Sequence, residues 1–179
     1  MAAGPAGKAD GGGAAAAAPI EIRALAADDR AWAAALLRER WGAALVVSRG
    51  REHRADELPG LVAWTPGGRA GLLTYRVAGP ECEVVTLDAL TPGRGTGTAL
   101  LEAVRALAAG RGCRRLWLVT TNDNVPAQRF YARRGWRLAA LHGDALSESR
   151  RLKPEIPLRG LDGAPLRDEP EYEQVLTDG

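Results

Sequence analysis

The pattern of apolar and polar positions in the first half of the chain predicts short strands around one helix. Asp28 and Asp29 offer an N-cap for a helix that runs to about Trp41. Residues 49–59 are mostly polar and predict a connection, and the Pro-Gly-containing residues 65–68 predict a hairpin turn. Alternation or short apolar runs predict four strands, at residues 20–25, 43–48, 61–64 and 71–76.

The second half of the chain predicts strands that alternate with helices. Helical spacing of apolar residues predicts a helix over residues 98–109, and Asn124 caps a second helix that ends near Arg134. Runs of apolar and β-branched residues predict four strands, at residues 83–90, 115–121, 136–141 and 171–176. This order predicts an α/β fold in which a largely parallel or mixed sheet carries helices on its faces.

Composition narrows the class of protein. Residues 1–19 are almost entirely Ala and Gly, which predicts a disordered leader before a single domain over residues 20–179, with a Pro-rich extension from about residue 152. No stretch approaches the roughly 20 apolar residues that cross a bilayer. The formal net charge of +2 gives no reason to expect a nucleic acid or a membrane as partner. We therefore expect a soluble, cytoplasmic protein.

The two cysteines, Cys82 and Cys113, are too few for a disulfide framework or a metal-binding cluster. Both lie in apolar, strand-like surroundings, which predicts buried thiols. Of the two histidines, His53 falls in the predicted polar connection and His142 at a strand end, so both are expected to be ordinary surface residues. We expect no bound metal.

A glycine-rich loop joins the predicted strand over residues 83–90 to the helix that follows. Gly93, Gly95 and Gly97 alternate there, so successive backbone amides can form a concave nest at a helix N-terminus, where an anion is stabilised. A tight turn explains such a loop equally well. Neither the P-loop lysine nor the spacing of the dinucleotide fingerprint is present, so the loop belongs to neither of these phosphate-binding motifs.

A second group of residues lies on the helix that begins at Asn124. Ala127 and Tyr131 are one turn apart on one face of it, and Gly135 ends it. A small residue allows a ligand to lie close to the helix, and the tyrosine hydroxyl can then reach that ligand. On spacing alone, Phe130 and Tyr131 are equally compatible with aromatic core residues.

Together the two segments resemble a known family. Residues 84–101, with the sequence VVTLDALTPGRGTGTALL, resemble motif A of the GNAT superfamily of acyl-CoA N-acyltransferases, and residues 122–136, NDNVPAQRFYARRGW, resemble its motif B. The resemblance covers roughly residues 20–142. It implies a mixed sheet, flanked by helices, that splays open between two parallel strands. One departure is Pro92, which stands three residues before Gly95 where the family usually has Gln or Arg.

The resemblance also implies a donor and its site. The donor would be acetyl-CoA, with its pantetheine arm between strands 82–90 and 115–121, paired with backbone in the way an added strand pairs. In this family the first of these strands commonly has a bulge. The residues that would contact the coenzyme are Leu87, Asp88, Ala89, Gly93, Arg94, Gly95, Thr96, Gly97, Thr98, Asn124 and Ala127.

Direct transfer to an amine requires a base, and the departing thiolate requires a proton donor. Glu83 is the preferred base and Asp88 the second choice, because strand alternation turns Asp88 to the opposite face unless a bulge shifts the register. Tyr131 is the expected general acid. A ping-pong route through a cysteine has little support, because neither thiol has an obvious activating neighbour.

The expected acceptor is a small-molecule or peptide amine, bound near residues 41–53 and the C-terminal tail. Trp41, Arg49, Arg51, Glu155 and Glu171 are candidate lining residues, although surface placement suits each equally. Both charge signs occur, so the sequence selects no acceptor class, and a homodimer is compatible with it. The alternative function is a non-catalytic acyl-CoA-binding module with the same fold.

Overall fold

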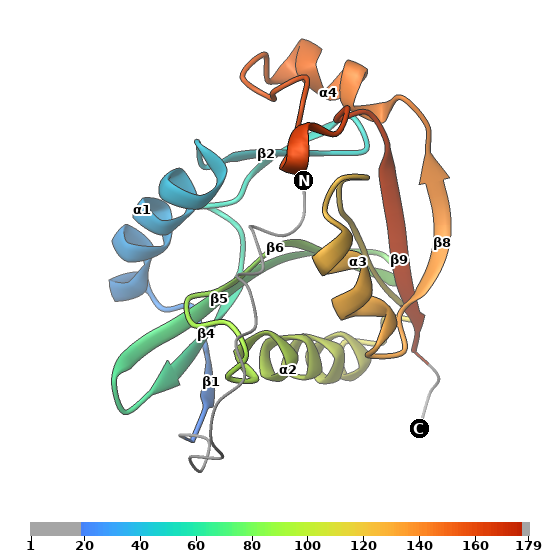
Figure 1. Cartoon of the computed structure of the whole chain (residues 1–179). Coiled ribbons are helices and arrows are strands. Elements are labelled where there is room, and N and C mark those ends of the chain that lie inside the picture. Colours follow the sequence, from blue (N-terminus) through green and yellow to red (C-terminus); the bar gives the residue numbers. More distant parts are fainter. Residues whose placement is uncertain (1–18, 177–179) are drawn as a thin grey trace.

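The computed structural model describes residues 19–176. The leader predicted for residues 1–19 therefore lies outside the described residues, except for Pro19. A seven-stranded mixed sheet in the order β1-β4-β5-β6-β7-β9-β8 is flanked by helices, and β6–β7 is its parallel pair. Figure 1 shows α1 on one side of this sheet and α2 and α3 on the other. The strands of the sheet are β1 (Glu21–Ala24), β4 (Gly60–Thr65), β5 (Gly68–Ala78), β6 (Glu81–Ala89), β7 (Arg115–Val119), β8 (Arg137–His142) and β9 (Glu169–Val175).

Two hydrophobic clusters cover the two faces of the sheet. The larger lies under α2 (Thr96–Gly110) and α3 (Val125–Ala132) and takes Val84 and Leu87 from β6. The smaller lies under α1 (Arg30–Trp41) and takes Val85 from the same strand. Burial of both clusters removes apolar surface from water, which is the main source of stability for such a domain.

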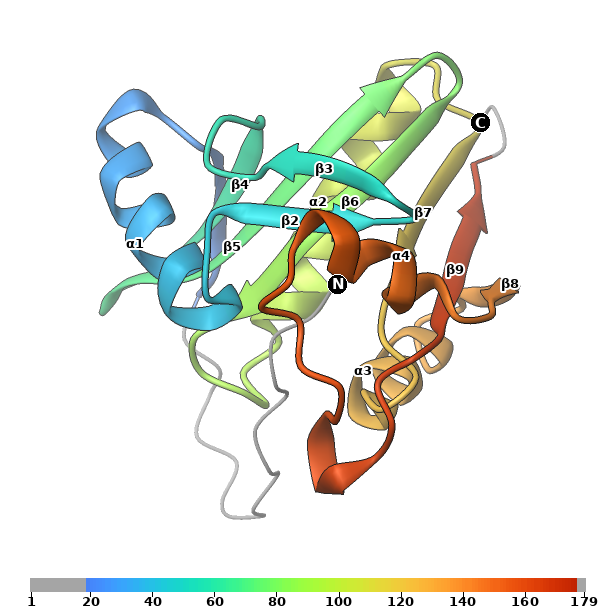
Figure 2. The same cartoon turned by 90° about the horizontal axis from the view of Figure 1, so that it is seen from above.

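A second, two-stranded sheet lies on the α1 side. β2 (Leu45–Ser48) and β3 (Arg51–Arg54) form a hairpin that passes over β5 and β6 (Figure 2). The prediction of a polar connection over residues 49–59 is therefore wrong in part. Arg49 and Gly50, at the turn, both have positive φ, 49° and 68°, as a two-residue type I′ hairpin turn requires. Arg-Gly lacks the Asn-Gly or Asp-Gly signature of such turns, and β3 buries only His53.

The C-terminal extension is more ordered than its composition predicts. Helix α4 (Ala145–Leu152) has no counterpart among the predicted elements. It buries only Leu146 and Ser149, so few apolar positions indicate a helix there. A short 3-10 turn at Leu161–Gly163 follows, and β9 then inserts between β7 and β8, two residues earlier than expected. Between Leu152 and β9 the chain therefore returns across the molecule to the gap between β7 and β8.

Strand β6 contains a β-bulge that reverses the expected alternation. Thr74 pairs with Thr86 and Tyr75 with Val84, so Val85 is the extra residue. Beyond the bulge, even-numbered residues share the face that Glu83 occupies before it. The exception stated for Asp88 therefore applies, because the bulge shifts the register, and both carboxylates lie on the α1 side.

Candidate active site

The glycine loop forms the start of α2 in the way an anion site requires. Gly95, with φ of +82°, is the N-cap residue, and the first helical bond runs from the Ala99 amide to the Gly95 carbonyl. The amides of residues 96–98 therefore have no partner within the helix, and a glycine cap supplies no side-chain acceptor for them. The helix begins two residues earlier than predicted.

The predicted loop residues come together but serve different purposes. A side chain at Gly93 would meet nothing within 4 Å, so the surface above the loop is open, and Arg94 is exposed. Gly97 instead packs closely against α3, because a Cβ there would lie 3.0 Å from the Phe130 ring and would require that ring to shift. The side chains of Thr96 and Thr98 are also engaged elsewhere. Thr96 is buried, and the Thr98 hydroxyl accepts a hydrogen bond from Arg134 Nε at 2.7 Å.

The parallel strands β6 and β7 separate partway along their length. Their ladder has three pairs and ends where Glu83 is opposite Trp117, whereas β6 continues to Ala89. Beyond Glu83 the β7-facing edge of β6 therefore has no strand partner among the described residues. Leu87, Asp88 and Ala89 lie on this part of β6, so their backbone edge can pair with an extended ligand.

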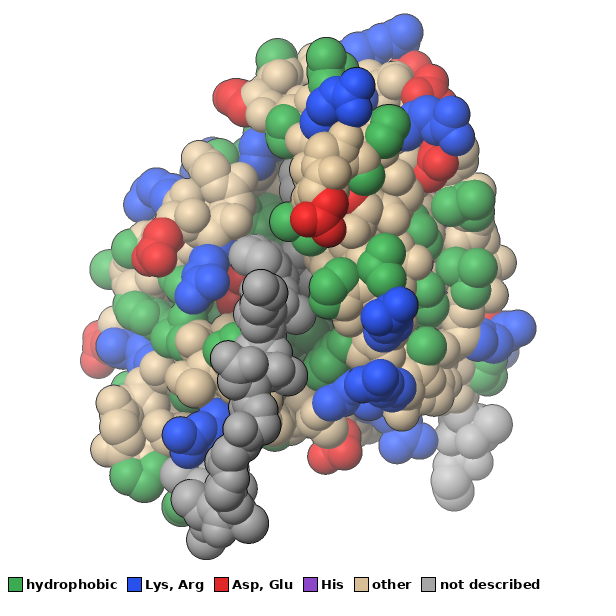
Figure 3. Space-filling model, viewed as in Figure 1, with side chains coloured by type: hydrophobic (Ala, Val, Ile, Leu, Met, Phe, Trp, Pro, Cys, Tyr) green, Lys and Arg blue, Asp and Glu red, His purple; other side chains and the backbone are tan. Residues whose placement is uncertain are grey.

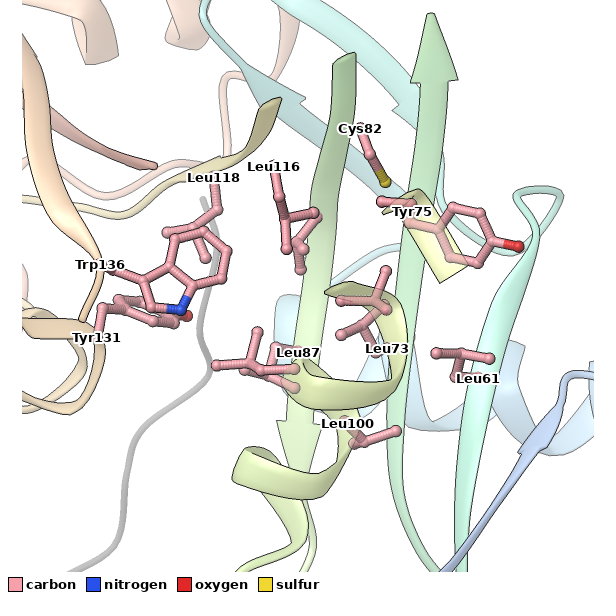
Figure 4. Packing of buried hydrophobic residues seen from close by; sticks show 14 of the residues in the cluster. Leu61, Leu73, Tyr75, Cys82, Leu87, Leu100, Leu116, Leu118, Tyr131 and Trp136 are labelled. Carbon is pink, nitrogen blue, oxygen red and sulfur yellow. The ribbon is translucent and has the colours of Figure 1, made fainter. Parts of the chain in front are cut away.

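Tyr131 is buried next to the gap between these strands. It is 1% exposed, and its hydroxyl has no hydrogen-bond partner among residues 19–176. Its ring packs against Trp136 and Tyr172, with centroids 5.8 and 5.9 Å away, and Figure 4 shows Tyr131 and Trp136 on the opposite side of the cluster from Tyr75. Burial raises the pKa of Tyr131, and the charge of Asp88 raises it further, so the hydroxyl keeps its proton at neutral pH.

Asn124 and Ala127 lie at the start of α3, the helix that carries Tyr131. The Asn124 side chain accepts a hydrogen bond from the Ala127 amide at 3.2 Å, which confirms the predicted N-cap. Ala127 is buried in the same cluster as Tyr131, one turn away. The unpaired, buried hydroxyl beside an open strand edge, together with the free amides of α2, fits an acyl-CoA whose thioester lies next to Tyr131.

Glu83 lies beneath the β2–β3 hairpin in a buried polar group. The Ser48 hydroxyl donates to Glu83 Oε1 at 2.5 Å, and His53 Nε2 is 3.0 Å from the same hydroxyl and 3.5 Å from Oε1. Burial raises the pKa of Glu83 and lowers the pKa of His53 to about 4, so the imidazole is neutral at physiological pH. The prediction that His53 is a surface residue is wrong, because the hairpin turns it inward.

Asp88 is the second buried carboxyl group on this face. The Trp41 indole N–H donates to its Oδ2 at 2.9 Å, and burial raises its pKa to about 6. Glu83 is the last residue of β6 that pairs with β7, and Asp88 lies beyond the bulge of the same strand, so both border the gap from the α1 side. We call this face, with Glu83, Thr86 and Asp88 of β6, the acceptor face.

A pocket of about 350 Å³ lies beside the acceptor face. The end of α1, the β7–α3 loop and the C-terminal extension line it, and Trp41 and Glu155 are the predicted lining residues found there. Figure 3 shows one face of the molecule, with hydrophobic and basic side chains exposed on its α3 side. Lys153 fixes the extension at this pocket, because its ammonium group donates to the carbonyls of Trp41 at 3.0 Å and Leu45 at 2.9 Å.

The other predicted lining residues lie outside this pocket. Arg51 is exposed on β3. Arg49 is 3.4 Å from Glu171, which also binds Arg115 and His142, so this group forms an ion-pair network on β9. A larger cavity of about 550 Å³ lies between α2 and the ends of β8 and β9; Thr98 lines it, whereas residues 93–97 and Tyr131 do not.

Burial determines the state of the two cysteines. Cys82 and Cys113 are free and buried, as predicted, and burial raises the pKa of Cys82 to about 12, which leaves almost no thiolate at neutral pH. Within residues 19–176, no group of three or more metal-binding side chains comes together. No helix in that range has the length and apolarity to span a bilayer.

The chain is similar to acetyltransferases in both sequence and structure. Residues 26–136 match the Acetyltransferase (GNAT) family. The uncharacterised protein YdhI of Bacillus subtilis is 40% identical over 139 residues, which cover 77% of this chain and 87% of YdhI. Among solved structures, an IAA acetyltransferase from Bacillus cereus superposes with a TM-score of 0.67 at 20% identity, covering 88% of this chain and all of that one (100%). A Bacillus subtilis acetyltransferase in complex with CoA gives a TM-score of 0.63 at 16% identity, covering 89% and 99%.

Proposed function

The chain belongs to the GNAT acetyltransferase family, and we propose that it transfers an acetyl group from acetyl-CoA directly to the amine of an acceptor. The observation that carries this proposal is the buried, unpartnered hydroxyl of Tyr131 beside the gap between β6 and β7. A buried hydroxyl without a partner costs free energy, which a ligand atom at that place would recover. The CoA-bound structure with the same fold supports the choice of donor.

The loop and strand edge hold the donor. The free amides at the start of α2, with the positive end of the helix dipole, bind the diphosphate. The unpaired edge of β6 at Leu87, Asp88 and Ala89 pairs with the pantetheine amides. The bound coenzyme supplies an activated thioester, and the bulge at Val85 provides backbone N–H groups for its carbonyl oxygen.

Two side chains, Glu83 and Tyr131, take part in the acetyl transfer. Glu83, directly or through one water, accepts the proton that the attacking amine must lose, and the raised pKa of its buried carboxyl group makes it a stronger base. The nitrogen then forms its bond to the acetyl carbon while the carbon–sulfur bond breaks. Tyr131 donates a hydrogen bond to the departing sulfur and so stabilises the thiolate as it forms. Because a thiol of pKa ~8.5 is much more acidic than this tyrosine, the proton stays largely on the tyrosine oxygen, and the thiolate takes its proton from solvent as it leaves.

Tyr131→Phe tests this role and separates an enzyme from a non-catalytic acyl-CoA-binding module. We expect kcat to fall by about 300-fold, within the range for loss of an acid catalyst, while affinity for acetyl-CoA stays within about twofold. Turnover is measured as thiol release with a panel of amines and affinity by calorimetry. The fold should be unaffected, since the hydroxyl makes no hydrogen bond within residues 19–176.

Tyr172→Phe is the matched control, because Tyr172 belongs to the same aromatic cluster and should keep normal turnover. If wild-type protein binds acetyl-CoA but releases no thiol with any amine, the binding module replaces the enzyme. If Tyr131→Phe turns over normally, the catalytic role of Tyr131 is wrong.

A further inference from the structure

The pocket of about 350 Å³ lies where an acceptor would approach the thioester. Trp41 lines it and also donates to Asp88 on the acceptor face. Thr121, just after β7, and Asn124, at the start of the helix that carries Tyr131, also line the pocket. The pocket therefore borders the gap between β6 and β7 on the side opposite α2.

Two cationic side chains, Arg40 and Lys153, line this pocket and form no ion pair with a carboxylate within residues 19–176. Lys153 is 6% exposed, and its two hydrogen bonds to carbonyl oxygens leave one of its three N–H donors free. Burial lowers the pKa of Lys153, which is consistent with a poorly compensated charge. Arg40 has a buried Nε with no hydrogen-bond partner within residues 19–176.

The charge of Glu155 partly offsets the lowering that burial causes in the pKa of Lys153, and Arg40 limits the rise that burial causes in the pKa of Asp88, but neither pair is close enough to form an ion pair. Asp123 accepts hydrogen bonds from the Thr121 hydroxyl and, at 2.7 Å, from the Leu161 amide, so both of its oxygens are engaged. Glu155 is exposed to solvent. A ligand carboxylate would satisfy Lys153 and Arg40 and offset the cost of burying their charges.

Size and lining restrict the rest of the ligand. A volume of about 350 Å³ is near the lower end for small-molecule sites, which are roughly 300–1,000 Å³. Ile156, Leu161 and Leu166 from the C-terminal extension, with Trp41, make much of the wall apolar. Resting on the proposed acetyl transfer, we propose that the acceptor is a small amine with an apolar carbon skeleton that also bears a carboxylate, an apolar α-amino acid being the simplest example.

Matched acceptors test this proposal. L-leucine, L-leucinamide and 3-methylbutylamine share one apolar skeleton, and only the first carries a carboxylate. Thiol release from acetyl-CoA should give a kcat/KM for leucine at least about 10-fold above that for either analogue, because a charge-assisted bond to a buried cation is strong. In Arg40→Gln and in Lys153→Met this preference should fall to about twofold or less.

Arg38→Gln is the matched control, because Arg38 lies on the same helix two residues away, is exposed and does not line the pocket. Lys153→Met also loses two hydrogen bonds, so its melting temperature is measured, and the ratio between acceptors is the readout because general destabilisation would not change it. If the carboxylate-free amines are equal or better acceptors, the inference is overturned while acetyl transfer stands. If no amine releases thiol although acetyl-CoA binds, the proposed function fails and the inference with it.

Discussion

The two faces of β6 carry different kinds of side chains, apolar on one face and mainly polar on the other. On the α2 and α3 side, Cys82, Val84 and Leu87 join an apolar cluster, and the groups available to a ligand are backbone amides and one tyrosine hydroxyl. On the acceptor face, Glu83, Thr86 and Asp88 are buried polar groups. Ser48 of β2 binds Glu83, Trp41 of α1 binds Asp88, and the Thr86 hydroxyl is hydrogen-bonded to Thr74 of β5. Under the proposed function, donor binding would therefore depend on main-chain geometry, whereas acceptor chemistry would depend on side chains.

The largest effect is expected from a change on the donor side. In Gly95→Glu, a side chain is forced into a backbone with φ of +82°, and a negative charge is placed where the diphosphate would bind. We expect affinity for acetyl-CoA to fall by about 1,000-fold, which corresponds to about 4 kcal/mol, in a calorimetric titration. Gly79→Glu is the matched control, because Gly79 also has positive φ, +57°, and lies in a distant exposed turn. Equal losses in both variants would mean that backbone strain, and not anion binding, explains the effect.

A smaller effect is expected on the acceptor face. Glu83→Gln should lower kcat by about 100-fold and leave affinity for acetyl-CoA unchanged. Because a base acts only when deprotonated, kcat/KM of the wild type should rise with pH through the pKa of Glu83, which burial raises, and this rise should be absent in the variant. The control is Glu81→Gln, two residues away on the same strand and paired with Arg115 at the surface. A rise near pH 6 that persists in Glu83→Gln and disappears in Asp88→Asn would identify Asp88 as the base.

The smallest effect is on stability. Folding raises the pKa of Asp88 to about 6 from 3.8, so the folded chain binds more protons than the unfolded chain between these values. The stability that Asp88 contributes is therefore full below pH 3.8 and decreases as the pH rises through 6. Asp88→Asn, which keeps an acceptor for Trp41, should raise the melting temperature at pH 7 by about 5 °C, and the gain should shrink on acidification. Exposed Asp28→Asn should change little, and a loss of stability in Asp88→Asn would contradict this account.

The sequence predicts the donor side well because its parts are contiguous. The order of strand, glycine loop and helix, the cap at Asn124 and the burial of Cys82 can each be inferred from local pattern, and all are present. Local pattern is enough here because each feature depends on residues within a few positions of one another. The functional roles of Tyr131 and of the loop residues stay predictions.

The acceptor face could not be predicted in the same way. Ser48 and His53 meet Glu83 through contacts between residues far apart in the chain, and no local signal marks them. The face of Asp88 depends on one extra residue, Val85, and a single-residue shift in a strand reverses every side chain after it. The position of Lys153 against Trp41 and Leu45 depends on the path of the C-terminal extension, which its Pro-rich composition leaves open.

A crystal structure with acetyl-CoA tests the central claim most directly. The account predicts the diphosphate oxygens within hydrogen-bonding distance of the amides of residues 96–98, and the thioester sulfur within reach of the Tyr131 hydroxyl. It also predicts pantetheine amides paired with the free edge of β6. Coenzyme bound elsewhere, for example in the larger cavity beside α2, would contradict this placement. A Tyr131 hydroxyl that makes no hydrogen bond to the bound ligand would contradict it as well.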